Sequence, residues 1–351
     1  MKSLFEKVHL HQKLNLPFVV YRKPNSKTLI GVFQNNDHLY FSENFVEKGF
    51  VFAPFDGTPI VFPLDNSEVK YNSIYFEKEF ESHIANDTED LYQKEQFVAL
   101  VKKGIFAIKR GEFNKVVLSR KESVQLDSFE MEAIYERMLQ LYPSAFCYCW
   151  FHPKIGLWMG ATPEKLIQAE GDVFNTMSLA GTQTYQGTEI VFWKDKEKEE
   201  QEFVTEFILE NLKSHAFNVN ASNPYTTRAG NLLHLRTDVE GIINDDSNLK
   251  KVIDILHPTP AVCGLPKFIA KDFILKNEGY DREFYTGFLG ELNHNFANDD
   301  NATDIFVNLR CMKIKDKTAQ LFIGCGITKD SNPEAEWEET VNKSKTMKRV
   351  L

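Results

Sequence analysis

The sequence predicts an α+β fold, and three observations support this prediction. β-like and helical segments are mixed without the regular strand–helix–strand alternation that builds a parallel sheet. The 351 residues are 42% hydrophobic and 26% charged, an ordinary globular composition with enough apolar surface for a large core. No internal repeat or low-complexity linker divides the chain. We therefore expect one compact body, in which residues 1–90 form a β-rich N-terminal portion and residues 91–351 the larger part.

Residues 1–85 are predicted to form short strands joined by turns. The β-like segments there are PFVVYRK, LIGVFQ, LYFSE, GFVFAPF and PIVFPL. Apolar residues then recur at helical spacing from Phe97 to Ile108, which predicts a helix. Further helices are expected around residues 129–141, 197–214, 248–256 and 333–348. The later strands are expected at KVVLSR, AFCYCWF, GLWMGA, IFVNLRCMKI and AQLFIGCGI.

Charge and cysteine usage restrict the partners and the compartment. A formal net charge of −9 disfavours a broad surface for nucleic acid or for an anionic membrane. The sequence has neither an apolar stretch of signal-peptide length at its start nor a run long enough to span a membrane. The cysteines are odd in number and lie in apolar runs without zinc-like spacing: Cys147, Cys149, Cys263, Cys311 and Cys325. We expect reduced thiols and a cytoplasmic protein without a nucleic-acid or membrane partner.

The acidic stretch KDKEKEEQEF, residues 194–203, opens a predicted helix with carboxylates on its apolar side. Phe203, Val204, Phe207 and Ile208 form the apolar stripe, and Glu200 falls near its centre. Glu197 lies roughly 60° away, whereas Lys198 and Glu202 fall on the far side. A glutamate in line with the core must be paired, protonated or bound to a metal.

A second helix repeats this arrangement. Asn332 is the expected N-cap and Pro333 the first helical residue. Glu336, Glu339 and Lys343 then share one face. These glutamates either complement the helix dipole or form, with Glu200 and Glu197, one shared oxygen-ligand site. An all-carboxylate set without His or Cys fits Mg²⁺.

The order of motifs resembles a known family. The segments, in order, are NKVVLSR, GATPEKLI, LAGT, KEKEEQEF, LLHL, LHPTPAVCGLP, YDREFYTGFLG, VNLRCMKI, LFIGCGI and EAEWEETVNK. This set resembles the chorismate-utilising enzymes: isochorismate synthases, salicylate synthases, and component I of anthranilate and aminodeoxychorismate synthases. The resemblance covers roughly residues 92–351. It implies two stacked β-sheets flanked by helices and makes residues 91–351 the chorismate-binding catalytic domain.

The resemblance also implies a Mg²⁺ cofactor and a substrate-binding set. Glu200 and Glu336 would be the principal Mg²⁺ ligands, with Glu197 and Glu339 beside them directly or through water. Arg310 would grip a chorismate carboxylate, because a planar guanidinium binds carboxylates in bidentate fashion. The other substrate-binding positions would be Gly181, Thr182, His234, Ala261, Tyr285, Leu309, Gly324 and Lys343. His234 either orients the reacting groups or is a hydrogen-bonded core histidine.

Two residues are expected to carry the chemistry. Isochorismate formation adds water at C2 and removes the C4 hydroxyl, so it needs a base and an acid. By resemblance, Lys115 is the base and Glu164 the acid. A free lysine is protonated at neutral pH, so this role requires surroundings that favour the neutral amine. The alternative for Lys115 is a surface lysine at a strand edge.

Departures within the family select the reaction. Anthranilate-type synthases carry glutamine where this chain has Lys115, and aminodeoxychorismate synthases often carry a lysine where it has Ala180. We therefore expect chorismate as the substrate and no glutaminase partner. The prediction is an isochorismate synthase, an isomerase of menaquinone or siderophore biosynthesis, with salicylate synthase as the alternative. A non-catalytic Mg²⁺- or metabolite-binding protein is the alternative from another class.

Overall fold

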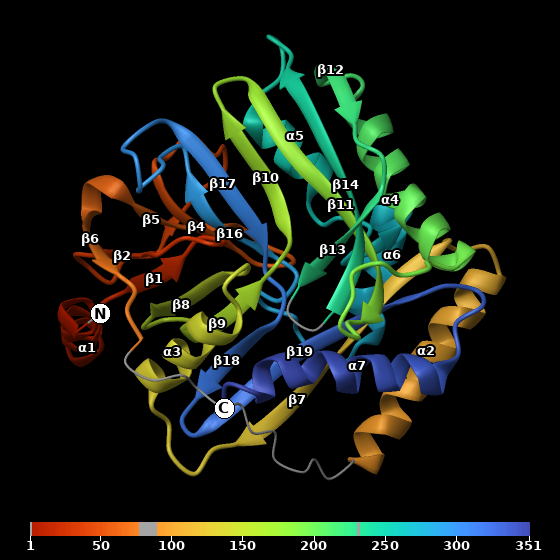
Figure 1. The fold of residues 1–351 in the computed structure, drawn as a ribbon, viewed down its shortest axis with the longest axis horizontal. Helices are drawn as coiled ribbons and strands as arrows, with labels where there is room; N and C mark the ends of the chain where they lie inside the picture. Colours follow the sequence, from red (N-terminus) through yellow and green to blue (C-terminus); the bar gives the residue numbers. More distant parts are fainter. Residues whose placement is uncertain (1, 77–89, 230–231) are drawn as a thin grey trace.

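The computed structural model describes residues 2–76, 90–229 and 232–351. Two antiparallel β-sheets form its body (Figure 1). The first sheet has the order β15 (Gly264–Leu265), β7 (Lys115–Gln125), β19 (Thr318–Ile327), β18 (Cys311–Lys315), β9 (Gly156–Thr162), β8 (Phe146–His152), β1 (Phe18–Arg22), β2 (Thr28–Gln34) and β6 (Ser67–Ser73).

The second sheet contains most of the remaining strands. Its order is β12 (Ala216–Ala221), β14 (Leu232–Ile243), β11 (Val173–Thr184), β10 (Lys165–Glu170), β17 (Ala302–Val307), β16 (Phe288–Leu292), β4 (Gly49–Ala53), β5 (Ile60–Pro63) and β3 (Tyr40–Phe41). The strand β13 (Tyr225–Ala229) also pairs with β14. N-terminal strands belong to both sheets, because β1 pairs with β8 and β4 pairs with β16.

An aromatic layer separates the sheets. Val19 and Tyr21 of β1 face this layer, where they join Phe50, Trp150 and other buried rings from both sheets. The alternate residues of β1 pack against helices on the opposite face of the first sheet, as the two-residue period of a strand requires. The two sheets are therefore stacked face to face.

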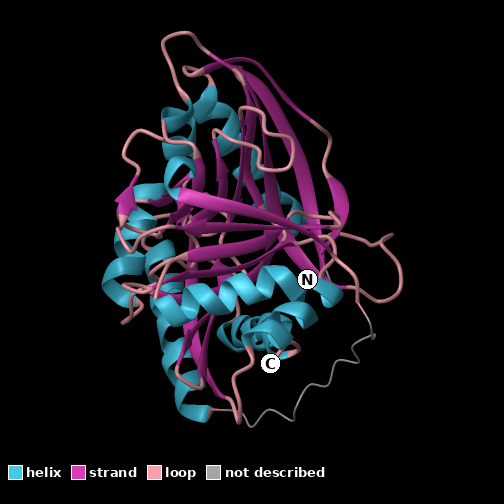
Figure 2. Ribbon diagram, turned by 90° about the vertical axis from the view of Figure 1, so that its left-hand side faces the viewer, coloured by secondary structure: helices cyan, strands magenta, loops and turns pink. Residues whose placement is uncertain are grey.

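Helices cover the outer faces (Figure 2). The helices are α1 (Lys2–Leu14), α2 (Leu91–Lys109), α3 (Met131–Leu141), α4 (Asp195–Leu212), α5 (Leu249–Leu256), α6 (Lys267–Asn277) and α7 (Pro333–Lys348). Helices α1 and α3 pack on the first sheet, and α4 and α5 pack on the second. Helices α2, α6 and α7 pack around β7 and β19. The predicted α+β fold of two stacked sheets flanked by helices is confirmed.

Several element predictions were wrong. The N-terminus forms α1 rather than strands and turns, because Leu4, Phe5 and Val8 share one buried helical face. Helix α6 was not predicted, since it buries Ala270 and Ile274 but exposes larger apolar residues such as Phe268.

None of the described helices is long and apolar enough to cross a membrane. All five cysteines are buried free thiols.

The segment IFVNLRCMKI, predicted as one strand, is split between the two sheets. Residues Ala302–Val307 form β17 in the second sheet, and Cys311–Lys315 form β18 in the first. The chain crosses between them through Asn308, Leu309 and Arg310. Arg310 has φ +48, a left-handed conformation that β-strand geometry excludes. This crossing places Arg310 between the two sheets.

Candidate active site

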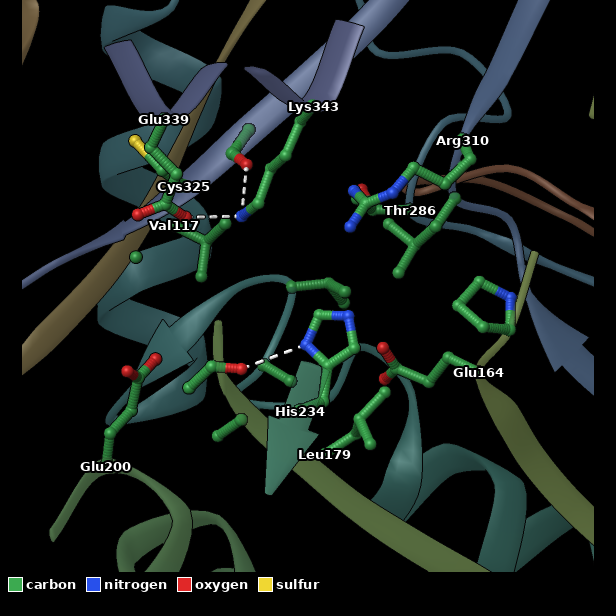
Figure 3. A pocket seen from close by; sticks show the side chains of 18 of the residues that line it. Val117, Glu164, Leu179, Glu200, His234, Thr286, Arg310, Cys325, Glu339 and Lys343 are labelled. Atoms are coloured by element: carbon green, nitrogen blue, oxygen red, sulfur yellow. Dashed lines mark hydrogen bonds and ion pairs between the residues drawn. The ribbon is translucent and has the colours of Figure 1, made fainter. Parts of the chain in front are cut away.

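One pocket brings together most of the predicted site residues. Those lining it are Glu164, Gly181, Glu197, Glu200, His234, Ala261, Tyr285, Leu309, Arg310, Gly324, Glu336, Glu339 and Lys343. Side chains from both sheets and from α4 and α7 reach this space (Figure 3). Lys115 lies just outside the lining. Thr182 belongs to β11, but its side chain lies outside the described residues.

Arg310 presents an available guanidinium to this pocket. In the part of the chain that the structure describes, its side chain makes no hydrogen bond or ion pair. Burial lowers its pKa, which nearby groups such as Tyr285 and Glu339 oppose. Figure 3 shows the guanidinium pointing toward the centre of the pocket. An uncommitted, partly desolvated guanidinium is suited to a ligand carboxylate.

Lys343 and Tyr285 lie beside Gly324, one of the expected substrate-binding positions. Lys343 Nζ donates to the carbonyl of Gly324 at 3.2 Å and pairs with Glu339 Oε1 at 2.5 Å. A Cβ on Gly324 would meet the Tyr285 hydroxyl at 2.8 Å, closer than side-chain carbons are found. Burial raises the pKa of Tyr285, so it remains a neutral phenol able to donate a hydrogen bond. Gly324 therefore leaves room beside two donors.

Glu164 is a buried carboxyl at the opposite side of the pocket. Only 5% of the residue is exposed, and burial raises its pKa to about 7 against the opposing charges of Arg310, Lys115 and Lys343. Its backbone is fixed, because Val307 N donates to the Glu164 carbonyl at 2.9 Å. A carboxyl with this pKa holds a proton in part at neutral pH and can donate it.

His234 lies on β14 and lines the same pocket as Glu164 (Figure 3). Its Nδ1 donates to the Gly181 carbonyl at 2.9 Å, which fixes the tautomer with the lone pair on Nε2. Burial, with Arg310 nearby, lowers its pKa to about 3. The ring is thus a neutral hydrogen-bond acceptor. His234 is therefore a buried, hydrogen-bonded histidine that lines the pocket, and its role in orienting the reacting groups stays a prediction.

Lys115 is buried at the edge of the pocket, with 5% of the residue exposed. The alternative of a surface lysine is wrong, because the short strand β15 pairs Leu265 against Lys115 and covers this edge. Lys115 Nζ lies 2.6 Å from Glu200 Oε1. Gly326 lies against this pair, since a Cβ there would meet Cε of Lys115 and Oε1 of Glu200, each at 3.1 Å.

The four predicted metal ligands line the same pocket from two helices. Asn332 caps α7, accepting from Glu334 N at 3.0 Å and Ala335 N at 3.1 Å, as predicted. In α4, Glu202 is exposed and Glu200 half-buried, as the helix register predicts. Phe203 was assigned to the buried stripe wrongly, since it is 50% exposed, whereas Val204 is buried.

The donor set fits a hard cation, although the carboxylates are held apart. Glu197 Oε2 is buried without a hydrogen-bond partner among the described residues, and all the ligands are oxygens. Glu200 pairs with Lys115, and Glu339 pairs with Lys343. Among the residues described, no three His, Cys, Asp or Glu side chains are grouped as a metal site. Glu200 and Glu339 would have to turn from their lysines to share one ion.

Arg282 supports the wall of the pocket from behind the lining residues, and the sequence analysis missed it. It donates to the carbonyls of Val117 at 2.7 Å and Val262 at 3.0 Å, and to Thr286 Oγ1 at 3.1 Å. These three acceptors belong to residues that line the pocket. Glu278 holds the guanidinium through a buried ion pair of 2.5 Å. Its place in the motif YDREFYTGFLG was the available signal.

Other lining residues also went unpredicted. They are Val117, Pro163, Leu179, Ala180, Val262, Thr286, Cys325 and Gly326. Each lies within, or directly beside, one of the ten motifs. The motifs therefore indicated the wall of the pocket better than the individual residues did.

The chain matches a known protein family and several named relatives. Residues 65–351 match the family model described as chorismate binding enzyme. The chain is 31% identical over 251 residues to isochorismate synthase EntC of Escherichia coli K12, covering 68% of this chain and 62% of that protein. It is 25% identical over 323 residues to isochorismate synthase DhbC of Bacillus subtilis, covering 85% and 79%. The chain thus spans less than two thirds of the length of EntC.

A solved structure shows the same fold. The menaquinone-specific isochorismate synthase MenF of Escherichia coli superimposes with a TM-score of 0.79 at 22% identity, covering 95% of this chain and 88% of that one. The family model extends over most of this chain, including α4, α7 and the strands that carry Lys115, His234 and Arg310. The chain is therefore a member of the chorismate-binding enzyme family.

Proposed function

We propose that this protein is an isochorismate synthase, a Mg²⁺-dependent isomerase that interconverts chorismate and isochorismate. The observation that carries the proposal is that a buried lysine and a buried carboxyl with a pKa of about 7 flank one pocket. A reaction that activates water and expels hydroxide needs one base and one acid at different positions of the ring. The relatives EntC and DhbC, which are isochorismate synthases, support the same reaction.

Arg310, Tyr285 and Lys343 bind the two carboxylates of the substrate. The guanidinium of Arg310 is available for a bidentate contact. The Tyr285 hydroxyl and the Lys343 ammonium lie on either side of Gly324, where the missing side chain admits the ligand. These contacts fix the ring between Lys115 and Glu164.

The reaction adds a hydroxyl group at C2 of the ring and removes the hydroxyl group at C4. Lys115 takes a proton from water, and the water oxygen bonds to C2 of the ring. The two ring double bonds each shift by one position, and the C4–O bond breaks. Glu164 gives its proton to the departing oxygen, which leaves as water. Burial keeps the His234 ring neutral, so it can accept a hydrogen bond from the bound substrate and does not take the proton of Glu164.

Glu200 and Glu336 would hold the Mg²⁺ ion, with Glu197 and Glu339 beside them directly or through water. When bound, the ion supplies positive charge for a substrate carboxylate. Glu200 is shared in this account, because it also neutralises Lys115 in the structure. Turning Glu200 toward the ion would break its ion pair with Lys115.

Two features favour water over ammonia as the nucleophile. Lys115 stands where anthranilate-type synthases carry glutamine, and Ala180 lines the pocket where aminodeoxychorismate synthases often carry lysine. We therefore propose that the chain works without a glutaminase subunit.

Product analysis tests the proposal. The protein is incubated with chorismate and Mg²⁺, with and without ammonium, and the products are resolved by chromatography. We expect isochorismate alone under both conditions. Salicylate with pyruvate would replace the proposal by salicylate synthase. An aminated product would indicate an anthranilate-type enzyme, and bound but unconverted chorismate a non-catalytic protein.

A further inference from the structure

A second cavity lies behind Lys115. It is bounded by the end of α2, the start of β7, the first half of α4 and the segment before α7. Residues that line it include Asn114, Lys115, Glu200, Phe203, Leu265 and Thr328. We call it the lysine-side cavity. It is open to solvent, since Asn114 and Phe203 are exposed residues.

The Lys115–Glu200 ion pair separates this cavity from the substrate pocket. Lys115 lines the lysine-side cavity but not the pocket, whereas Glu200 lines both. Their charged atoms lie 2.6 Å apart. The ion pair therefore lies between the substrate pocket and the lysine-side cavity.

Gly326 lies against this ion pair. It lines the substrate pocket, and a Cβ there would meet Cε of Lys115 and Oε1 of Glu200, each at 3.1 Å. A larger residue would fill the space between the pair and the pocket. The glycine thus keeps the amine of Lys115 within reach of a ligand in the pocket.

We propose that the lysine-side cavity is the route by which the nucleophilic water reaches Lys115 while the substrate occupies the pocket. The inference rests on the proposed function, because it requires Lys115 to activate water. Glu164 lies in the pocket itself, so the departing water is released on the substrate side. Water entering beside Lys115 approaches from the other side. The incoming water would then arrive through the lysine-side cavity and the departing water would leave through the pocket. Separate paths suit a reaction that adds oxygen at C2 and removes it at C4.

The lining of the cavity fits water better than a second organic anion. Lys115, the side chain of Asn114 and the carboxylates of Glu199 and Glu200 supply hydrogen-bond partners. The lining holds the lysines Lys109, Lys115 and Lys329 and the carboxylates Glu199, Glu200 and Asp330, so its formal charges balance and it carries no excess positive charge for an anion. Phe203 and Leu265 complete the walls without polar groups. The cavity therefore suits small neutral molecules.

A labelling experiment tests the route without using catalysis. The variant Lys115→Cys is treated with methyl methanethiosulfonate, and modification at position 115 is followed by mass spectrometry. Background is low, because burial raises the pKa of all five native thiols. Ala261→Cys serves as the matched probe, since Ala261 lines the substrate pocket.

We expect chorismate to protect position 261 but not position 115. Adding Asn114→Trp, which narrows the lysine-side cavity, should slow labelling at position 115 by about tenfold. Asn220→Trp, an exposed asparagine on β12 away from both spaces, should leave it unchanged. Protection of position 115 by chorismate, with no effect of Asn114→Trp, would overturn the route. The Asn114→Trp comparison remains informative even if chorismate is not the ligand.

Kinetics supply a second test in the otherwise unaltered protein. Asn114→Trp should lower kcat about tenfold while the chorismate Kd stays the same, because only water delivery is obstructed. Asn220→Trp should change neither. An unchanged kcat in Asn114→Trp would contradict the proposal. A protein that never forms isochorismate refutes the proposed function instead, and the labelling result still decides the route.

Discussion

Lys115 Nζ and Glu200 Oε1 lie 2.6 Å apart, so the expected base and an expected metal ligand form one ion pair. Lys115 comes from the first sheet and Glu200 from α4, which packs on the second. The expected base on one sheet and the expected metal ligand on α4 are therefore in direct contact. Any change at Glu200 acts on both the metal and the lysine.

Glu200→Gln should reduce Mg²⁺ affinity and activity by about 10- to 100-fold, because the amide removes a ligand charge and leaves Lys115 without its counterion. Isothermal titration with Mg²⁺ and activity after EDTA treatment measure the two effects. Glu202→Gln is the matched control, since Glu202 is exposed on the same helix. Equal losses in both variants would contradict the assignment of α4's pocket-facing side.

Glu164 should give the enzyme a pH dependence near neutrality. Burial raises its pKa to about 7, so the proton donor is lost as the pH rises above this value. We expect kcat to fall above about pH 7 and Glu164→Gln to remove this limb together with most of the activity. A pH–rate profile of the protein and the variant measures this. A limb that persists in residual Glu164→Gln activity belongs to another group.

The same shift should affect stability. The folded protein binds the Glu164 proton more tightly than the unfolded chain, in which the pKa of a glutamate carboxyl has its ordinary value of 4.5. The free energy of unfolding therefore falls as the pH rises from about 4.5 to about 7 through this group. Glu164→Gln should gain stability relative to the parent over that window. Urea unfolding at several pH values checks the sign, and a difference independent of pH would refute it.

Arg310→Lys should lower kcat/KM for chorismate by about 10- to 100-fold, because a point charge cannot reproduce a bidentate contact. Steady-state kinetics measures the loss. Arg110→Lys is the control, since Arg110 is an exposed arginine paired with Glu112 outside the pocket. Unchanged kcat/KM in Arg310→Lys would make Arg310 a structural residue.

Arg282→Met should destabilise the protein by about 3–5 kcal/mol, because it leaves Glu278 buried without its partner. KM for chorismate should also rise, since three segments of the pocket wall lose their shared donor. Denaturant unfolding and kinetics measure the two effects. Lys276→Met breaks an exposed pair with Asp272 at the same spacing, so it should cost less than about 1 kcal/mol. Equal costs would contradict the tethering role of Arg282.

Local rules predicted the helices that carry the glutamates. The N-cap Asn332 and the spacing of Glu336, Glu339 and Lys343 are properties of one helix, which its sequence reveals directly. The face of α4 was likewise readable from Glu200 and Glu202. The exposure of Phe203 was not, because it depends on how α4 sits beside α2 and the segment before α7.

Features that depend on contacts between distant parts of the chain were not predicted from the sequence. The apolar run around Arg310 gives no sign that its two halves join different sheets. The burial of Lys115 requires Leu265, which follows it by 150 positions and covers the strand edge. Arg282 looks like a surface charge until Val117, Val262 and Thr286 are placed around it. Such contacts follow from topology rather than from local pattern.

Interconversion of chorismate and isochorismate by Lys115→Gln tests whether Lys115 activates the nucleophilic water. Glutamine keeps a polar side chain of similar length but cannot take a proton from water. Forward and reverse rates are measured with chorismate and isochorismate, while calorimetry with Mg²⁺ present confirms that chorismate still binds through Arg310. The account predicts a loss of about 10²–10⁴-fold in both directions with binding retained. Near-parental rates in Lys115→Gln would remove the lysine from the mechanism and contradict the account.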